Sequence, residues 1–148
     1  MRAVIDTNIF VSACIGAGFA SSVIEACITG LVQPVLGAKL FLEYEDLLAR
    51  EAPFLNARLD GAERQLLFNV FVSKCEWCPV YFLWRPNLRD EGDNHIVELA
   101  IAGNADYVVT SNVRDFRRPD LRFDNLSIMT PERFLQELRN ERRNDPDS

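Results

Sequence analysis

Acidic side chains follow short apolar segments at widely separated positions, and this placement suits metal chemistry. Asp6 comes directly after the short, mostly apolar run 2–5, and Asp115 comes shortly after the mostly apolar run 107–110. Asp93 begins a helical pattern that leads back toward the second of these segments. If both segments are strands of a parallel sheet, their carboxyl ends meet at one edge and the three carboxylates converge there. Such oxygen ligands are the ones that Mg²⁺ or Mn²⁺ prefers.

Short polar side chains accompany these carboxylates and are suited to orienting them. They are Thr7, Asn8, Thr110, Ser111 and Asn112. Single residues also have simpler explanations, because Asp-Thr-Asn is a common turn sequence and Asp93 is a favourable residue at a helix start. The expected convergence of several such residues, rather than any one of them, favours a site.

Strands and helices alternate along the chain. Short apolar runs predict strands at residues 2–5, 32–36, 76–82, 107–110 and 126–129. Apolar residues at helical spacing predict helices at residues 20–29, 38–50, 61–74 and 93–102, and Pro131 is well placed to open a last helix. Pro79 cannot donate to a central ladder, so the 76–82 segment is expected at a sheet edge. This alternation predicts an α/β fold with a largely parallel sheet.

Size and composition indicate one globular domain, with 148 residues of which 48% are hydrophobic and 26% charged. No apolar run approaches the roughly 20 residues that span a bilayer, and Asp6 and Asn8 interrupt the apolar start that a signal peptide would need. We therefore expect a cytoplasmic protein without membrane contact. The net charge of −6 disfavours a passive nucleic-acid binder. It is compatible with carboxylates that recruit cations and with a basic protein partner.

Cysteine and histidine offer little alternative chemistry. Cys75 and Cys78 form a CxxC, but no second CxxC or HxxxH pair completes a zinc site. We expect these two, with Cys14 and Cys27, to be reduced core residues. His95 is the only histidine, and we expect no direct role for it because an imidazolium beside a metal ion is repelled. The flanking arginines either contact phosphates or are simply solvated: Arg85, Arg89, Arg114, Arg117 and Arg118.

Four segments, in this order, resemble the acidic segments of PIN-domain proteins. They are Asp6-Thr7-Asn8 after a short apolar strand, residues 37–48 with Glu43 at the family's acidic position, residues 90–100 with Asp93 at the metal-binding aspartate, and residues 105–116. Helical geometry alone leaves Glu43 and Glu45 equivalent, because both flank the apolar stripe at about 100° per residue. The resemblance runs from residue 1 to about residue 135, so we expect a PIN domain over 1–139 and a polar, disordered tail over 140–148.

The resemblance implies a three-layer α/β/α sandwich with a central, mainly parallel sheet. It also implies a metal-dependent ribonuclease that uses Mg²⁺ or Mn²⁺ to hydrolyse RNA, with Asp6, Glu43, Asp93 and Asp115 as catalytic and metal-binding residues. The most similar branch contains toxins of toxin–antitoxin pairs, related to VapC-like ribonucleases. Membership of that branch implies a small basic antitoxin as partner and a homodimer.

One position departs from the family pattern, because many relatives have Asp where this chain has Asn112. Either Asp115 substitutes for that acid or Asn112 binds through its amide oxygen. The departure leaves a second hypothesis open, in which the domain keeps the fold but serves as a catalytically weakened RNA- or protein-binding module. A phosphotransfer enzyme with Asp6 as nucleophile ranks lower, because such enzymes usually need a second Asp where this chain has Asn8.

Overall fold

Five short parallel strands form the centre of the protein, whose computed structural model describes residues 1–80, 94–116 and 125–144. The strands are β1 (Arg2–Ile5), β2 (Gln33–Leu36), β3 (Glu76–Trp77), β4 (Tyr107–Val109) and β5 (Ser127–Met129). Their order across the sheet is β3-β2-β1-β4-β5, and each neighbouring pair is parallel. The predicted α/β class with a mainly parallel sheet is confirmed.

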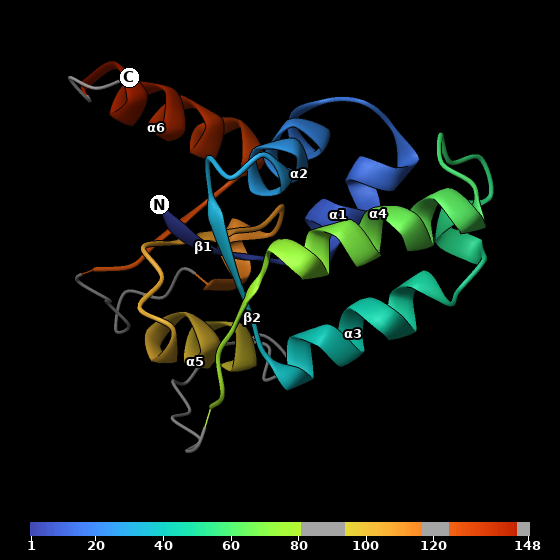
Figure 1. The fold of residues 1–148 in the computed structure, drawn as a ribbon, viewed down its shortest axis with the longest axis horizontal. Helices are drawn as coiled ribbons and strands as arrows, with labels where there is room; N and C mark the ends of the chain where they lie inside the picture. Colours follow the sequence, from blue (N-terminus) through green and yellow to red (C-terminus); the bar gives the residue numbers. More distant parts are fainter. Residues whose placement is uncertain (81–93, 117–124, 145–148) are drawn as a thin grey trace.

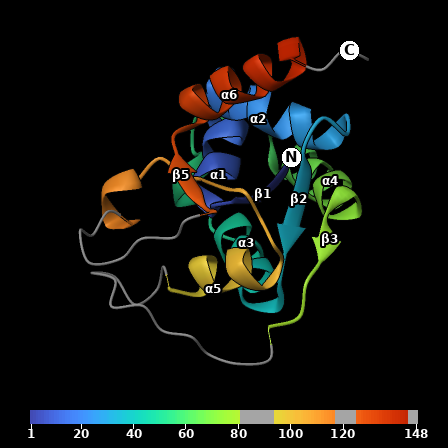
Figure 2. The same cartoon turned by 90° about the vertical axis from the view of Figure 1, so that its left-hand side faces the viewer.

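Helices cover the sheet on two sides. They are α1 (Thr7–Ile15), α2 (Phe19–Ile28), α3 (Ala38–Leu48), α4 (Gly61–Lys74), α5 (Asn94–Ala102) and α6 (Pro131–Asn144), with short 3₁₀ turns η1 (Ala52–Phe54) and η3 (Val113–Phe116). Figure 1 gives the path of the chain, and Figure 2 shows α2 and α6 above the sheet with α3 and α5 below it. In the described residues no single helix is long and apolar enough to cross a membrane, although α1 and α2 pass that test jointly across a 109° bend.

Helix α1 corrects the expectation from the sequence, which placed the first helix at residues 20–29. Asp6 is not a turn residue but the N-cap of α1, and its side chain accepts a hydrogen bond from the backbone N–H of Thr7. The buried residues Ile9, Phe10, Ala13 and Cys14 share one face of the helix. Their spacing is a helical signal, and the polar triplet before it concealed the helix start.

Two further boundaries differ from those predicted. The edge strand predicted over 76–82 is formed only by Glu76–Trp77 in the described residues, and residues 81 and 82 lie outside them. Pairing ends where the Cys78 N–H donates to Leu36 O at 2.8 Å, because the next residue, Pro79, has no N–H. Helix α6 continues to Asn144 instead of ending before residue 140. Arg142 and Arg143 lie in its last turn, where positive charge favours the helix. Residues 145–148 of the expected tail lie outside the described residues.

Close packing and one buried hydroxyl bring α3 and α5 to the end of β1. A Cβ on Gly37 would lie 3.0 Å from Leu99 Cδ1 and 3.2 Å from Cys78 O, and a Cβ on Gly103 only 2.7 Å from Val35 Cγ1. A larger residue than the N-cap Gly37 would therefore push against α5 and the chain after β3. The buried Tyr44 donates from its hydroxyl to Ile5 O at 2.6 Å, which fixes α3 beside Asp6.

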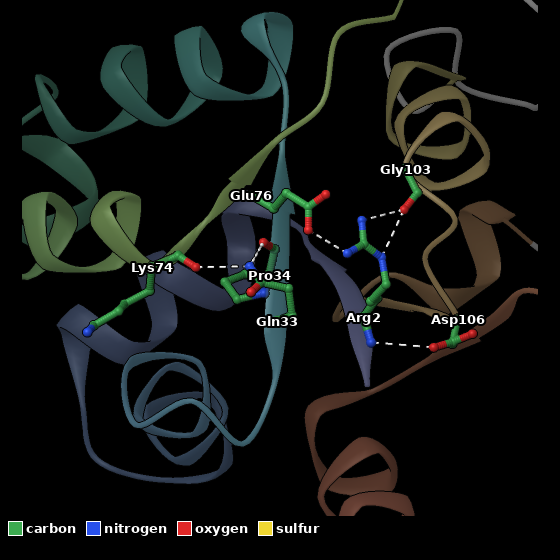
Figure 3. Close-up of polar contacts among 7 residues, drawn as sticks. All are labelled: Arg2, Gln33, Pro34, Lys74, Glu76, Gly103 and Asp106. Atoms are coloured by element: carbon green, nitrogen blue, oxygen red, sulfur yellow. Dashed lines mark hydrogen bonds and ion pairs between the residues drawn. The ribbon is translucent and has the colours of Figure 1, made fainter.

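Arg2 joins three elements at the beginning of the strands, opposite the carboxyl ends (Figure 3). Its guanidinium donates to Gly103 O at 2.7 and 3.0 Å and pairs with Glu76 at 2.5 Å, while its backbone N–H reaches Asp106 at 3.4 Å. Hydrogen bonding from Arg2 lowers the pKa of the exposed Glu76. We assign these contacts a structural role, because they join β1 to β3 and to the end of α5.

Candidate functional site

The Asp6 carboxylate lies at the carboxyl end of β1 and is held by three neighbouring residues. Its Oδ1 accepts a hydrogen bond from Thr7 N at 2.7 Å. Its Oδ2 accepts one from Thr110 Oγ1 at 2.8 Å and one from Asn8 Nδ2 at 3.2 Å. The residue is only 7% exposed. A buried carboxylate held in one orientation is a preorganised oxygen ligand.

Burial is the main influence on the charge of Asp6. It raises the pKa of the carboxyl above its ordinary value, although hydrogen bonds from Thr110 and Thr7 act in the opposite direction. The negative charge of Glu43 raises this pKa further, and His95 lowers it. The carboxylate is therefore destabilised in the protein alone, and a bound cation would offset that cost.

The loop after β4 completes the support around Asp6. Thr110 Oγ1 accepts from Asn8 Nδ2 at 3.3 Å and from Asn112 N at 3.1 Å, and Asn8 Oδ1 accepts from Ser111 N at 3.1 Å. Two of these contacts, from Asn8 to Thr110 and from Ser111 to Asn8, connect residues about a hundred positions apart in the sequence. The five polar residues expected to support the site, including Thr7, thus lie together at the ends of β1 and β4.

Glu43 is distinguished from Glu45 by its contact with α5. His95 Nε2 and Glu43 Oε1 lie 2.9 Å apart, with the His95 side chain 6% exposed and the Glu43 side chain 40% exposed. Glu45, by contrast, is exposed on the same helix. The sequence pattern did not reveal this role of His95 as a neighbour of the acidic edge.

The other two predicted acids are placed less fully. Asp93 lies outside the described residues, immediately before α5. Asp115 belongs to η3, three positions after Asn112. Of the flanking arginines, Arg114 lies in η3, and the other four fall outside the described residues. Among the described side chains, no group of three or more His, Cys, Asp or Glu residues is placed to hold a metal ion.

The four cysteines are all free thiols. Burial raises the pKa of Cys14 to about 11 and that of Cys27 and Cys75 to about 12. These thiols are protonated near neutral pH and are weak nucleophiles and ligands. Cys14 and Cys27 are buried in the core, and Cys75 and Cys78 are partly buried against it.

Asp6 should make the stability of the metal-free protein depend on pH. Since its folded-state pKa is raised, its stabilising contribution is fully present below the ordinary pKa of 3.8 and is lost as pH rises through the folded-state pKa. We expect the free energy of unfolding of the wild type, relative to Asp6→Asn, to fall as the pH rises above about 4. Urea denaturation of both proteins in EDTA measures this difference. A difference that is constant or grows with pH contradicts the expectation.

Comparisons with known proteins agree on the fold. A protein-family model described as a PIN domain matches residues 2–114, a span that includes Asp6, Glu43 and Asp93 and ends just before Asp115. A solved structure titled VapBC2 from Rickettsia felis, bound to a DNA fragment from its promoter, matches with a TM-score of 0.56. The two chains are 19% identical, and the match covers 88% of this chain and 98% of that one. A comparison with curated proteins gives no match.

Proposed function

The chain belongs to the PIN domain family, and from the site that it carries we propose that it is a metal-dependent endoribonuclease that hydrolyses RNA phosphodiester bonds. The observation that carries the proposal is the buried Asp6 carboxylate, held by Thr7, Asn8 and Thr110 beside Glu43. Its raised pKa reports an environment that favours a bound cation over a bare negative charge.

The donor set fits Mg²⁺ or Mn²⁺. The acidic side chains offer carboxylate oxygens, which are hard donors, and hydroxyl and amide groups support them. We propose Asp6 and Asp93 as the ligands of one ion, with Glu43 and Asp115 supporting it or a second ion. When bound, the ion supplies Lewis acidity that activates a water and offsets charge on the scissile phosphate.

The chain's own residues would set the geometry of hydrolysis. Thr110 and Thr7 hold the two oxygens of Asp6 in one orientation, and His95 does the same for Glu43. An open hollow of about 820 Å³ lies beside this edge. Its lining includes Ser111, Asn112, Thr130, Arg114 and Arg133. We propose that these two arginines contact the RNA backbone there.

The fourth acidic position gives a test with two opposite substitutions. Asn112→Asp adds a carboxylate to the loop held by Thr110, so Mn²⁺ affinity without RNA should increase about tenfold. Asp115→Asn removes one from η3, so Mn²⁺ affinity and cleavage rate should both fall about tenfold. Calorimetric titration of Mn²⁺ and a cleavage assay measure both effects. If Asp115→Asn binds Mn²⁺ and cleaves RNA like the wild type, the site rests on Asp6, Glu43 and Asp93.

We also propose a cellular role as the toxin of a toxin–antitoxin pair, acting in the cytoplasm as a homodimer. The support is the net charge of −6, which suits a small basic antitoxin, and the structural likeness to a VapBC2 complex. Expression of this chain alone should arrest growth, and co-expression of a small basic protein from the neighbouring gene should restore it. Absence of arrest at verified expression would reject the toxin role without rejecting the nuclease.

A second candidate function, a weakened RNA- or protein-binding PIN domain, is favoured by Asn112 alone. This function requires that folded protein bind Mn²⁺ no better than Asp6→Asn does. Calorimetric titration of Mn²⁺ into the wild type and into Asp6→Asn therefore separates the two functions.

A further inference from the structure

A second polar feature lies on α5, one turn beyond His95. Glu98 is only 6% exposed, and its Oε1 has no hydrogen-bond partner among the residues that the structure describes. An unpartnered buried acceptor costs free energy, so such a group calls for an explanation. Glu98 also stands inside an otherwise apolar stretch of the helix, between Val97 and Leu99.

Glu98 lines a cavity of about 350 Å³ between the start of α3, the end of β3 and α5. This volume lies within the range of about 300–1,000 Å³ that is usual for small-ligand sites. The lining residues are Gly37, Ala38, Lys39, Leu40, Trp77, Pro79, Val80, His95, Glu98 and Leu99. His95 is shared with the acidic edge, where it contacts Glu43. A molecule in the cavity would therefore lie next to the proposed cleavage site.

The cavity offers three kinds of contact. Trp77 is 52% exposed and presents an aromatic surface, with Leu99 and Val80 as further apolar contacts. Lys39 and the first turn of α3 form a positive end, because the N-cap Gly37 supplies no side-chain hydrogen bond to that turn. The unpartnered Oε1 of Glu98 is a hydrogen-bond acceptor. The matching ligand has a flat apolar body, N–H donors and a negative group.

We propose that this cavity binds one nucleotide of the RNA substrate and selects guanine, an inference that rests on the proposed ribonuclease function. The base stacks on Trp77, its N–H groups donate to Glu98, and a phosphate lies near Lys39 and the start of α3. Guanine has two adjacent donors on its pairing edge, N1–H and the 2-amino group. Adenine and cytosine place an acceptor next to their amino group, and uracil has a single N–H.

The charges disfavour an arginine side chain from a protein partner as the occupant. A guanidinium would satisfy Glu98 and could stack on Trp77. It would also bring a positive charge beside Lys39 and the positive end of α3, which repel it. A nucleotide has the phosphate that this end of the cavity attracts.

Binding of the four nucleoside 5′-monophosphates and inosine 5′-monophosphate in EDTA tests the proposal without any cleavage. We expect guanosine monophosphate to bind about tenfold more tightly than those of adenosine, cytidine and uridine. Inosine monophosphate, which lacks the 2-amino group, should bind more weakly than guanosine monophosphate. Glu98→Gln should remove the preference for guanosine monophosphate over the other four ligands. Lys39→Gln should lower the affinity for all five ligands by a similar factor. Glu45→Gln, an exposed change on α3, is the matched control.

Equal affinities for all five ligands, or a guanine preference that Glu98→Gln leaves intact, overturn the proposal. So does Glu98-dependent binding of an arginine-containing peptide with no nucleotide binding. Circular dichroism and the Tm of each variant check that it folds. If Glu98→Gln does not fold, the affinities of Lys39→Gln still test the proposal. RNA cleavage without guanine preference would reject this site alone. Guanine binding without RNA cleavage would reject the ribonuclease function alone.

Discussion

Asp6→Asn is expected to lower the rate of metal-dependent RNA cleavage about a thousandfold while the protein stays folded. The carboxylate lies where β1, α1 and the loop after β4 meet. Its negative charge is what would bind a cation, and asparagine lacks that charge. Loss of several kcal/mol of stabilisation at the transition state corresponds to this factor. Asp93→Asn should have a similar effect. Single-turnover cleavage of a labelled RNA at saturating Mn²⁺ measures both.

The matched control for these variants is Asp46→Asn. Asp46 is exposed on α3 and pairs with Arg50 at 2.6 Å, away from the acidic edge. It should cleave RNA at the wild-type rate, and circular dichroism should give the same spectrum for all three variants. Wild-type cleavage by both Asp6→Asn and Asp93→Asn would mean that the proposed site is wrong.

Glu43→Gln should lower the cleavage rate about a hundredfold, and Glu45→Gln should leave it unchanged. Both residues lie on α3 and both flank its apolar stripe, but only Glu43 contacts His95 and acts on the charge of Asp6. Glutamine keeps an oxygen for that contact and removes the negative charge, so the variant isolates the contribution of charge, which is several kcal/mol at most. Rates are compared at saturating Mn²⁺ and RNA. Equal rates for the two variants would contradict the assignment of Glu43.

Several features of the site could be predicted because they depend on strand ends. Each parallel strand is a short apolar run, so the polar residue that ends it is visible in the sequence, as with Asp6 after β1 and Thr110 after β4. Because β1 and β4 are parallel, their carboxyl ends lie at the same edge of the sheet. Helix α1 was missed for a local reason, since Asp-Thr-Asn suits a turn and an N-cap equally well.

Other features depend on contacts that no local pattern encodes. Glu43 and Glu45 have the same helical periodicity, and the choice between them comes from the tight approach of α3 to α5 at Gly37. That approach also brings His95 to Glu43. The sequence indicates Glu98 only weakly, as a single acid within an apolar helix. That its Oε1 has no hydrogen-bond partner within the described part of the chain is visible only in three dimensions.

The most direct test of metal-dependent hydrolysis is an analysis of the RNA products and their ends. Purified protein is incubated with single-stranded RNA in EDTA, and again after addition of excess Mn²⁺. We expect no cleavage in EDTA, cleavage after Mn²⁺ is added, and products without 2′,3′-cyclic phosphate, because an activated water rather than the RNA 2′-hydroxyl attacks phosphorus. Cleavage that persists in EDTA and leaves 2′,3′-cyclic phosphate ends would contradict the proposed function.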